Sequence, residues 1–305
     1  MRPSPLFVPV LLLIACDKGD TADDTSPEIV LEEFPRCADH DPLRQPFFGD
    51  THVHTVYSFD ANGQDTRNTP RDAYRFAKGE QVGLQPYRPD GTATRTARLR
   101  RPLDFTVLTD HAELLGEIRM CSTPGSPGYD GDFCWVYQNF RPATFSFMAV
   151  RTMIQRDRFA FCGEDGELCL EQARLVWKDI QAAAEEAYDR SAECTFSSFV
   201  GYEWTGSVGT GENLHRNVVF RNDKVPERPP SWVDTASAFD LWTHLQAQCV
   251  DGVDGCEALT IPHNSNISGP GLMFASAKLE GPDDLSLPVD AKEARLRRRW
   301  EPLVE

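Results

Sequence analysis

The sequence predicts an α/β fold, large enough for a barrel that carries an insertion. Short β-branched runs alternate along the chain with amphipathic helical patterns, which is the order typical of α/β proteins. The length of 305 residues suits one barrel of about 250 residues with additions, or two domains of about 150. Hydrophobic residues make up 40% of the chain and charged residues 26%, a globular composition.

The elements are predicted in the following order. Short apolar runs rich in β-branched and aromatic residues indicate strands at 47–54, 103–109, 196–204, 215–220 and 258–263. Helical periodicity indicates helices at 70–79, 170–190, 236–249 and 290–300. The first of these begins with a proline and the last with an aspartate, as helices often do. Residues 80–101 are polar, rich in arginine and without a clear period. Residues 115–195 are too many for one crossover, so we expect a mainly helical insertion there.

The N-terminus has the pattern of an export signal followed by a lipid-attachment site. An apolar run over residues 6–15 is too short to span a bilayer as a helix, but it suits a signal peptide. It ends in Leu-Ile-Ala-Cys16, which resembles a bacterial lipobox; an ordinary signal peptide with a coincidental cysteine is the alternative. We expect a signal peptide at 1–15, and a lipidated Cys16 that starts an acidic tether over 16–40. The protein would then be anchored by lipid in the bacterial cell envelope, on its periplasmic or cell-surface side.

The chain has nine cysteines, and eight remain if Cys16 is lipidated. An even number of cysteines in an exported protein favours disulfides. Short loops suggest three of the pairs and elimination suggests the fourth, although other pairings are open: Cys162 with Cys169, Cys249 with Cys256, Cys121 with Cys134, and Cys37 with Cys194. A cysteine-rich zinc site is the weaker alternative, because the chain has no C-x₂-C pair.

The formal net charge of −16 limits the classes of partner. Nucleic-acid binding needs clustered lysines and arginines that neutralise phosphates, so we expect no nucleic-acid partner. An anionic substrate is not excluded, because bound metal ions can reverse the local field.

The seven histidines are distributed unevenly. Five of them lie at an end of a predicted strand: His52, His54, His111, His215 and His263. Barrel enzymes collect their catalytic residues at strand ends, so this placement indicates a functional site. The other two, His40 and His244, have no such context and are interpreted as structural.

The segment Asp50-Thr51-His52-Val53-His54 is the most informative motif. Residues i and i+2 of a strand point to the same face, so His52 and His54 would present two imidazoles to one point. Imidazole suits zinc, iron, nickel or copper, whereas carboxylates suit harder ions. Asp60 follows after a short loop and could turn back as an oxygen ligand.

Several polar residues near the other strand ends have more than one interpretation. Asp110 could bind a metal, hold a histidine tautomer or cap a helix. Glu203 follows a buried apolar run and needs a partner, which a metal or an arginine could supply. His215 could be a ligand or a core histidine with its hydrogen bonds satisfied, and Arg216 could contact phosphate or lie on the surface.

Together, the runs FGDTHVHTVYSFDANG and LDFTVLTDHAELLGE resemble the PHP superfamily, named for polymerase and histidinol phosphatase domains. They are most similar to a large bacterial PHP-like family of uncharacterised function. The resemblance implies a distorted (β/α)₇ barrel over residues 41–305, with two or three zinc, manganese or iron ions at its strand ends. By the family pattern the metal ligands are His52, His54, Asp60, His111, Glu203, His215 and His263. The catalytic group would be His52, His54, His111 and Glu203, supported by Asp50, Asp110 and Arg216.

The sequence departs from the family pattern at its C-terminal end. Family members finish with a D-x-H motif on a late strand, and no such motif follows His263. We therefore expect a C-terminally truncated barrel that lacks its last strands. A naturally short protein with an incomplete site is the alternative.

The expected function is that of a metal-dependent hydrolase, a phosphoesterase that activates water against a small anionic phosphoester. An amide or ester hydrolase of the amidohydrolase type is the first alternative, since those barrels also begin with H-x-H; they typically carry a bridging lysine, whereas Glu203 occupies such a position here. A non-catalytic, surface-binding lipoprotein is the second. The chain has no P-loop, nucleophile elbow or H-E-x-x-H helix, so a serine or cysteine nucleophile has no support.

Overall fold

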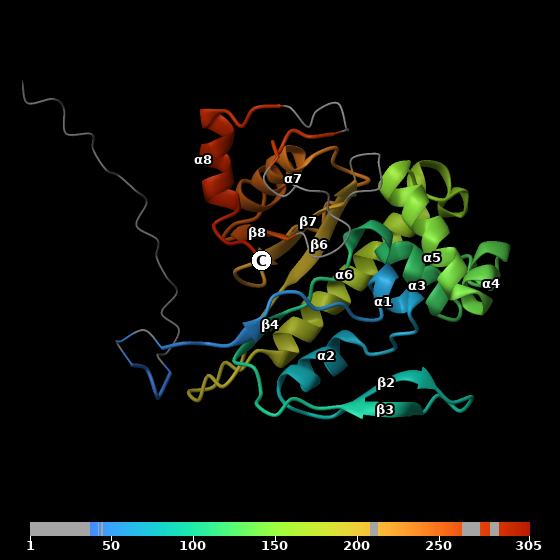
Figure 1. Cartoon of the computed structure of the whole chain (residues 1–305), viewed down its shortest axis with the longest axis horizontal. Helices are drawn as coiled ribbons and strands as arrows, with labels where there is room; N and C mark the ends of the chain where they lie inside the picture. The colour runs from blue at the N-terminus through green and yellow to red at the C-terminus, as the bar shows by residue number, and fades with distance from the viewer. Residues whose placement is uncertain (1–36, 42, 44, 208–212, 264–274, 281–286) are drawn as a thin grey trace, which may run out of the picture. The chain divides into compact units, whose positions relative to one another are not determined.

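The chain folds as a mixed α/β protein (Figure 1). This computed structural model describes residues 37–41, 43, 45–207, 213–263, 275–280 and 287–305. The expected signal peptide and Cys16 lie outside the described residues. Within these ranges, no helix combines the length and the apolar character that crossing a bilayer requires.

A parallel sheet forms one part of the fold. It has the order β1 (Gly49–Asp50), β4 (Phe105–Val107) and β5 (Ser197–Phe199). After one further residue the chain continues from β5 into β6 (Gly201–Ser207), and a parallel bridge joins His111 to Glu203. The carboxyl ends of β1, β4 and the β5–β6 segment therefore lie next to one another.

The second sheet is antiparallel, whereas the repeating units of the expected distorted (β/α)₇ barrel would give parallel strands. It has the order β6, β7 (Asn213–Phe220) and β8 (Ala258–His263), with His215 opposite both Thr205 and His263. Only residues 208–212 separate β6 from β7, and a parallel crossover needs a dozen residues or more. No closed barrel forms among the described residues.

Helix α2 (Pro70–Ala77) and a hairpin pack beside the parallel sheet. Thr69 and Asp72 form a capping box, and Pro70 occupies the first turn, as predicted for a helix starting here. The polar stretch after α2 forms the antiparallel strands β2 (Val82–Tyr87) and β3 (Ala93–Ala97), which the sequence did not predict. Most of β3 is exposed, so its residues show no alternation of apolar and polar side chains.

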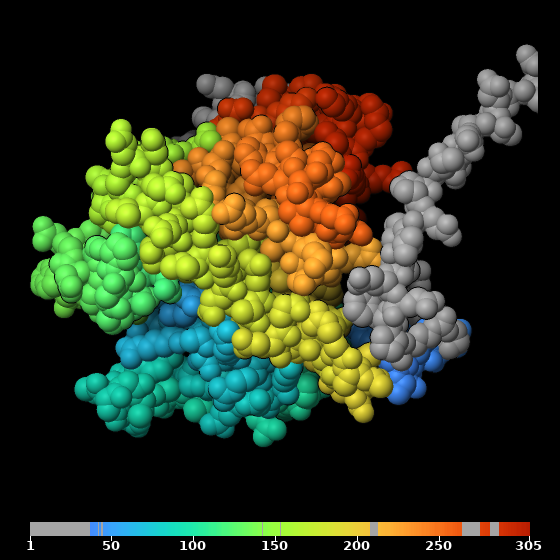
Figure 2. All heavy atoms as spheres, turned by 180° about the vertical axis from the view of Figure 1, so that it is seen from behind, coloured from blue at the N-terminus to red at the C-terminus, as the bar shows by residue number. Residues whose placement is uncertain are grey.

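The range expected to be a helical insertion contains four α-helices: α3 (Leu115–Ser122), α4 (Asp132–Asn139), α5 (Arg141–Ala149) and α6 (Glu167–Ala187). Short turns of other helix types occur at Ala112–Leu114, Val150–Ile154, Ala160–Cys162, Glu164–Gly166 and Gln246–Val250. Leu114, Ile118, Met120, Tyr137 and Met148 form part of a buried cluster separate from the main core. Figure 2 shows α3–α5 (green) as a projecting lobe beside α6.

All four predicted disulfides are confirmed: Cys37–Cys194, Cys121–Cys134, Cys162–Cys169 and Cys249–Cys256. Two of them lie within the insertion, and Cys37–Cys194 ties the first described residue to the loop before β5. Disulfides persist in oxidising compartments, which indicates an extracellular or periplasmic environment.

The main core lies between α6 and the antiparallel sheet. It buries tryptophans 177, 204, 232, 242 and 300, each 2% exposed or less. Helix α7 (Ala238–Leu245) contributes Trp242, and α8 (Ala291–Trp300) contributes Trp300. As predicted, an aspartate opens α8, because the Asp290 side chain accepts a hydrogen bond from the Glu293 amide.

Gly116 allows α3 and α6 to approach closely, so Gly116→Ala should destabilise the fold. A Cβ atom at this position would lie 1.9 Å from the carbonyl oxygen of Cys169, which is backbone and cannot rotate away. We expect a loss of about 1–3 kcal/mol in the free energy of unfolding, despite the better helix propensity of alanine. Urea denaturation measures this loss, with Glu171→Ala at an exposed position of α6 as the control. Equal stability of the two variants would contradict the close packing.

Candidate metal centre

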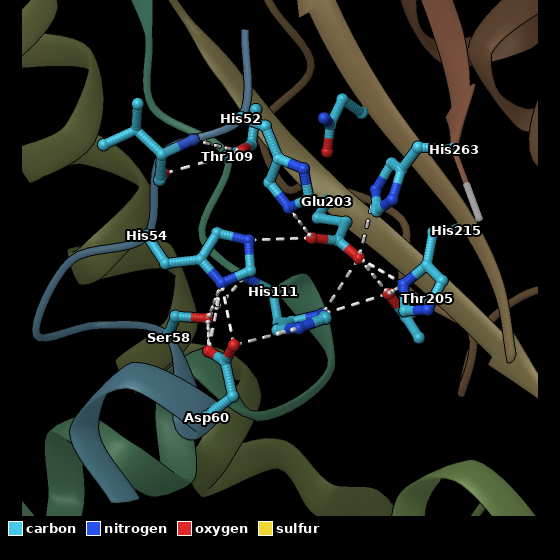
Figure 3. Close-up of polar contacts among 12 residues, drawn as sticks. His52, His54, Ser58, Asp60, Thr109, His111, Glu203, Thr205, His215 and His263 are labelled. Carbon is cyan, nitrogen blue, oxygen red and sulfur yellow. Dashed lines mark hydrogen bonds and ion pairs between the residues drawn. The ribbon is translucent and has the colours of Figure 1, made fainter. Parts of the chain in front are cut away.

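A buried carboxylate, Glu203 of β6, lies at the centre of a histidine cluster (Figure 3). Its side chain is 1% exposed. The Oε2 atom lies 2.8 Å from His54 Nε2 and 3.4 Å from His52 Nε2. The Oε1 atom lies 2.6 Å from His215 Nδ1. The partners are therefore imidazoles, not the arginine that was the alternative.

Two further histidines complete the ring around Glu203. His111 Nδ1 and His263 Nε2 lie 3.6 and 3.5 Å from Glu203 Oε1. The rings of His52 and His263 have their centroids 4.2 Å apart, although β1 and β8 belong to different sheets. The fold thus brings together all five histidines that were expected at strand ends.

Asp60 forms the other end of the cluster. It lies in α1 (Phe59–Gly63), the short helix that follows the H-x-H loop. Both carboxylate oxygens lie 3.0 Å from His54 Nδ1, and Oδ2 lies 3.8 Å from His111 Nε2. Ser58 donates a hydrogen bond of 2.6 Å to Oδ1 and so orients the carboxylate.

The strand register explains how distant residues meet. His52 and His54 follow β1, and His111 follows β4, at adjacent carboxyl ends of parallel strands. Across the antiparallel sheet, Thr205, His215 and His263 occupy one row of paired positions. Side chains in such a row share a face of the sheet, which places both histidines beside Glu203.

Three overlapping groups of side chains have the spacing of metal ligands. They are His52–His54–Glu203, His54–Asp60–His111 and Glu203–His215–His263, and within each group the ligand atoms lie within 4.8 Å of one another. Glu203 belongs to two groups and has one oxygen facing each. His54 also belongs to two, with Nε2 toward Glu203 and Nδ1 toward Asp60.

The protonation equilibria of the cluster favour binding of a cation. Burial opposes the charge on Glu203, but His111, His215 and the other histidines hold the pKa of this carboxyl well below its usual range. Burial also opposes a charge on His54, but hydrogen bonds to Asp60 and Glu203 raise its pKa well above the usual value. Positive charge is thus favoured beside these carboxylates, and a metal ion would supply it in place of protons.

His263 provides the clearest test of whether a metal fits. The residue is 2% exposed, and among the described residues neither ring nitrogen makes a hydrogen bond, although Nε2 lies 3.5 Å from Glu203 Oε1. Burial lowers the pKa of His263, which favours the neutral imidazole that binds metals. A buried imidazole without hydrogen bonds is costly, so this ring is suited to be a metal ligand. A mixed set of imidazoles and carboxylates suits zinc, manganese or iron.

Two supporting residues were not assigned from the sequence. Thr205 donates a hydrogen bond of 2.6 Å to Glu203 Oε1, and its hydroxyl lies 3.0 Å from the Nδ1 atoms of His111 and His215. Glu113 is fully buried; it accepts hydrogen bonds from the amides of Thr205 and Trp232. The signal for Thr205 was its i+2 spacing from Glu203 on a strand.

The three residues expected to support the ligands have different roles. The Asp110 carboxylate accepts hydrogen bonds of 2.5 and 2.8 Å from Thr55, so it holds the loop after His54 instead of a histidine ring or a helix end. Burial raises the pKa of Asp110 to about 6. Asp50 accepts a hydrogen bond from the His52 amide. Arg216 is neither on the surface nor directed at the cluster, because it is 2% exposed and pairs with Glu301 at 3.0 Å.

One other group of side chains has metal-like spacing of its ligand atoms but not the chemistry of a metal site. Glu117, Cys162 and Cys169 lie close together in the insertion. The two sulfur atoms form a disulfide, and Glu117 pairs with Arg158 at 3.1 Å. These residues therefore stabilise the insertion and do not form a thiolate site.

Replacing both His52 and His54 by alanine should remove bound metal. The two rings belong to two of the three ligand groups, so we expect loss of on the order of one equivalent of zinc or manganese per chain. Elemental analysis after dialysis of the purified full chain measures the loss. His244→Ala is the matched control, because His244 lies on α7 and contacts the Asp240 carbonyl. Unchanged metal content in the double variant would remove the metal-centre assignment.

Thr205→Val should weaken metal binding without unfolding the protein. Valine has nearly the shape of threonine, but it cannot hold the Glu203 carboxylate by a hydrogen bond. We expect metal affinity to fall about 10- to 100-fold, as for other groups that orient ligands. Competition with a chromogenic chelator measures the affinity. Thr243→Val, at an exposed position of α7, should behave as the wild type; an equal loss in both variants would contradict the role of Thr205.

Comparisons with known proteins place this chain in a family. Neither the curated proteins nor the solved structures include a match. A family model described as "Protein of unknown function (DUF3604)" matches residues 41–305. That range covers well over half of the chain and contains every residue of the cluster. The chain therefore belongs to the DUF3604 family.

Proposed function

We propose that this protein is a metal-dependent hydrolase of the PHP type that cleaves phosphoesters. The observation that carries the proposal is the set of three overlapping ligand groups that share Glu203 and His54. Paired sites with a shared carboxylate are the arrangement by which two-metal enzymes place a pair of ions on one substrate. The expected number of ions is two or three, of zinc, manganese or iron.

The residues of the cluster would have the following roles in the reaction. Bound divalent ions supply Lewis acidity and a water of lowered pKa. Glu203 directs one oxygen to each of two ligand groups, so it holds them at a short separation. Asp60 and His111 form the other end of the cluster, and Thr205 prevents the Glu203 carboxylate from rotating. His52 and Asp60, with side chains 17% and 27% exposed, are where solvent and substrate would approach.

The composition of the cluster favours phosphoesters over amides. A phosphoryl group offers several anionic oxygens to neighbouring ions, which suits three adjacent ligand groups. The amidohydrolase alternative would place a lysine at the bridging position. Among the described residues the cluster contains no lysine, and Glu203 occupies its centre.

The arrangement of strands supports a barrel-like architecture of the PHP kind. Asn217 of β7 donates a hydrogen bond of 3.0 Å to the Thr51 carbonyl that follows β1. The antiparallel sheet therefore curves back toward the parallel one, and the carboxyl end of β8 meets that of β1 at His263 and His52. We propose that this curvature corresponds to the distorted barrel.

We also propose that the enzyme acts in the cell envelope, anchored by a lipid on Cys16, on a small anionic substrate and not on nucleic acid. The four disulfides support an exported protein.

The test is hydrolysis of p-nitrophenyl phosphate by the purified full chain with added zinc, manganese or iron. We expect activity that a chelator abolishes and metal restores. Glu203→Gln and His54→Ala should each lower kcat/KM by on the order of a hundredfold or more, because each removes a shared ligand.

His244→Ala should retain full activity in the same assay. Parallel assays with p-nitrophenyl acetate and an anilide test the amidohydrolase alternative. If the metal-loaded protein hydrolyses only the acetate ester or the anilide, the amidohydrolase alternative would replace the phosphoesterase proposal. Full activity in Glu203→Gln would show that the cluster is not the catalytic site.

A further inference from the structure

A cavity of about 410 Å³ adjoins the metal centre. It lies between the end of β1, helix α2 and strand β2, and His52 and His54 form part of its wall. Protein interiors contain few voids larger than a water molecule, whereas ligand pockets typically have about 300–1,000 Å³. A cavity of this size against two candidate metal ligands has the dimensions of a binding site.

The walls away from the histidines are mainly apolar. Apolar side chains come from α2, from β2 and from the segment that leads to β4: Phe76, Ala77, Val82, Leu84, Leu99 and Leu103. A ligand held by hydrogen bonds along its length would leave this surface unused. An aliphatic or aromatic group would remove it from water, which is favourable in proportion to the area covered.

Three of the polar side chains at the cavity have partners within the protein. Asn68 donates to the Gly83 carbonyl, Asp72 accepts from the Thr69 amide, and Asp50 accepts from the His52 amide. These three side chains are therefore oriented by the protein itself and not by a ligand.

The charges at the cavity also select against a second anionic group. Of the described residues that line it, none is a lysine or an arginine, whereas Asp50 and Asp72 are acidic. Asp72 pairs with Arg75 at 3.1 Å, so a phosphate or carboxylate far from the metal centre would meet the Asp50 carboxylate and no lysine or arginine of the described lining. The geometry therefore suits a ligand with one anionic end, placed at the histidines, and an uncharged remainder that lies in the cavity.

We propose that this cavity binds the apolar part of the substrate, so that the preferred substrates are phosphoesters of an uncharged aliphatic or aromatic alcohol. The inference rests on the proposed phosphoesterase function and names its substrate class. Sugar phosphates, nucleotides and other esters with several charges would be poor substrates.

The test is binding of n-alkylphosphonates to the metal-loaded full chain, measured by calorimetry and by inhibition of p-nitrophenyl phosphate hydrolysis. From methyl- to hexylphosphonate, we expect the affinity to rise about fourfold per methylene, the gain for burying one such group. A flat series, with methylphosphonate still bound, would overturn the inference and leave the phosphoesterase proposal intact.

Two variants test the cavity itself. Leu84→Asp places a charge in its wall, and Ala73→Leu fills it from α2. Both should flatten the alkyl series while methylphosphonate affinity stays unchanged. Leu175→Asp, at a site on α6 that is 43% exposed, should follow the wild type. An undiminished series in both cavity variants would also overturn the inference.

Binding of n-octanol distinguishes failure of the apolar-site proposal from failure of the phosphoesterase proposal. This alcohol has an alkyl chain but no anionic group. We expect saturable calorimetric binding that Leu84→Asp abolishes, with or without metal. If methylphosphonate does not bind but octanol does, the phosphoesterase proposal fails and the apolar site stands. If octanol does not bind, the apolar site fails.

Discussion

The site depends on one constraint, the burial of the Glu203 carboxylate. A buried charge without compensation costs several kcal/mol, so positive or hydrogen-bonding groups have to surround it. Here five imidazoles do so, and they come from the ends of β1 and β4 and from β7 and β8. Each of these strands must therefore end at or pass the same point, which limits how the two sheets can pack.

The helical insertion supports the same site by packing against helix α1. Phe145 of α5 stacks on Phe59 of α1 with the ring centroids 5.6 Å apart, and Phe59 in turn packs on the ring of His111 at 4.7 Å. Helix α1 carries Asp60, so the insertion holds this carboxylate against the cluster. The disulfides Cys121–Cys134 and Cys162–Cys169 restrict the insertion. Their structural role thus extends to the geometry of a candidate ligand.

Local patterns predicted much of this arrangement, and non-local features account for what was missed. The i, i+2 spacing of His52 and His54 indicated two convergent rings, and short cysteine loops indicated two of the insertion's crosslinks. The hairpin β2–β3 was missed because the mostly exposed strand β3 lacks hydrophobic alternation. The direction of β7 and β8 was also missed, since a strand pattern is the same whether its neighbour is parallel or antiparallel.

The sequence by itself determined the mixed α/β class, the positions of the candidate ligands at strand ends and the three cysteine pairs that close short loops. These follow from spacing, periodicity and composition, which are properties of short segments. Only the tertiary structure decided that His215 and His263 share a row with Thr205, that Arg216 pairs with Glu301, and that an apolar cavity adjoins His52. Those features depend on strand register and on packing between residues far apart in the chain, where no local pattern carries the information.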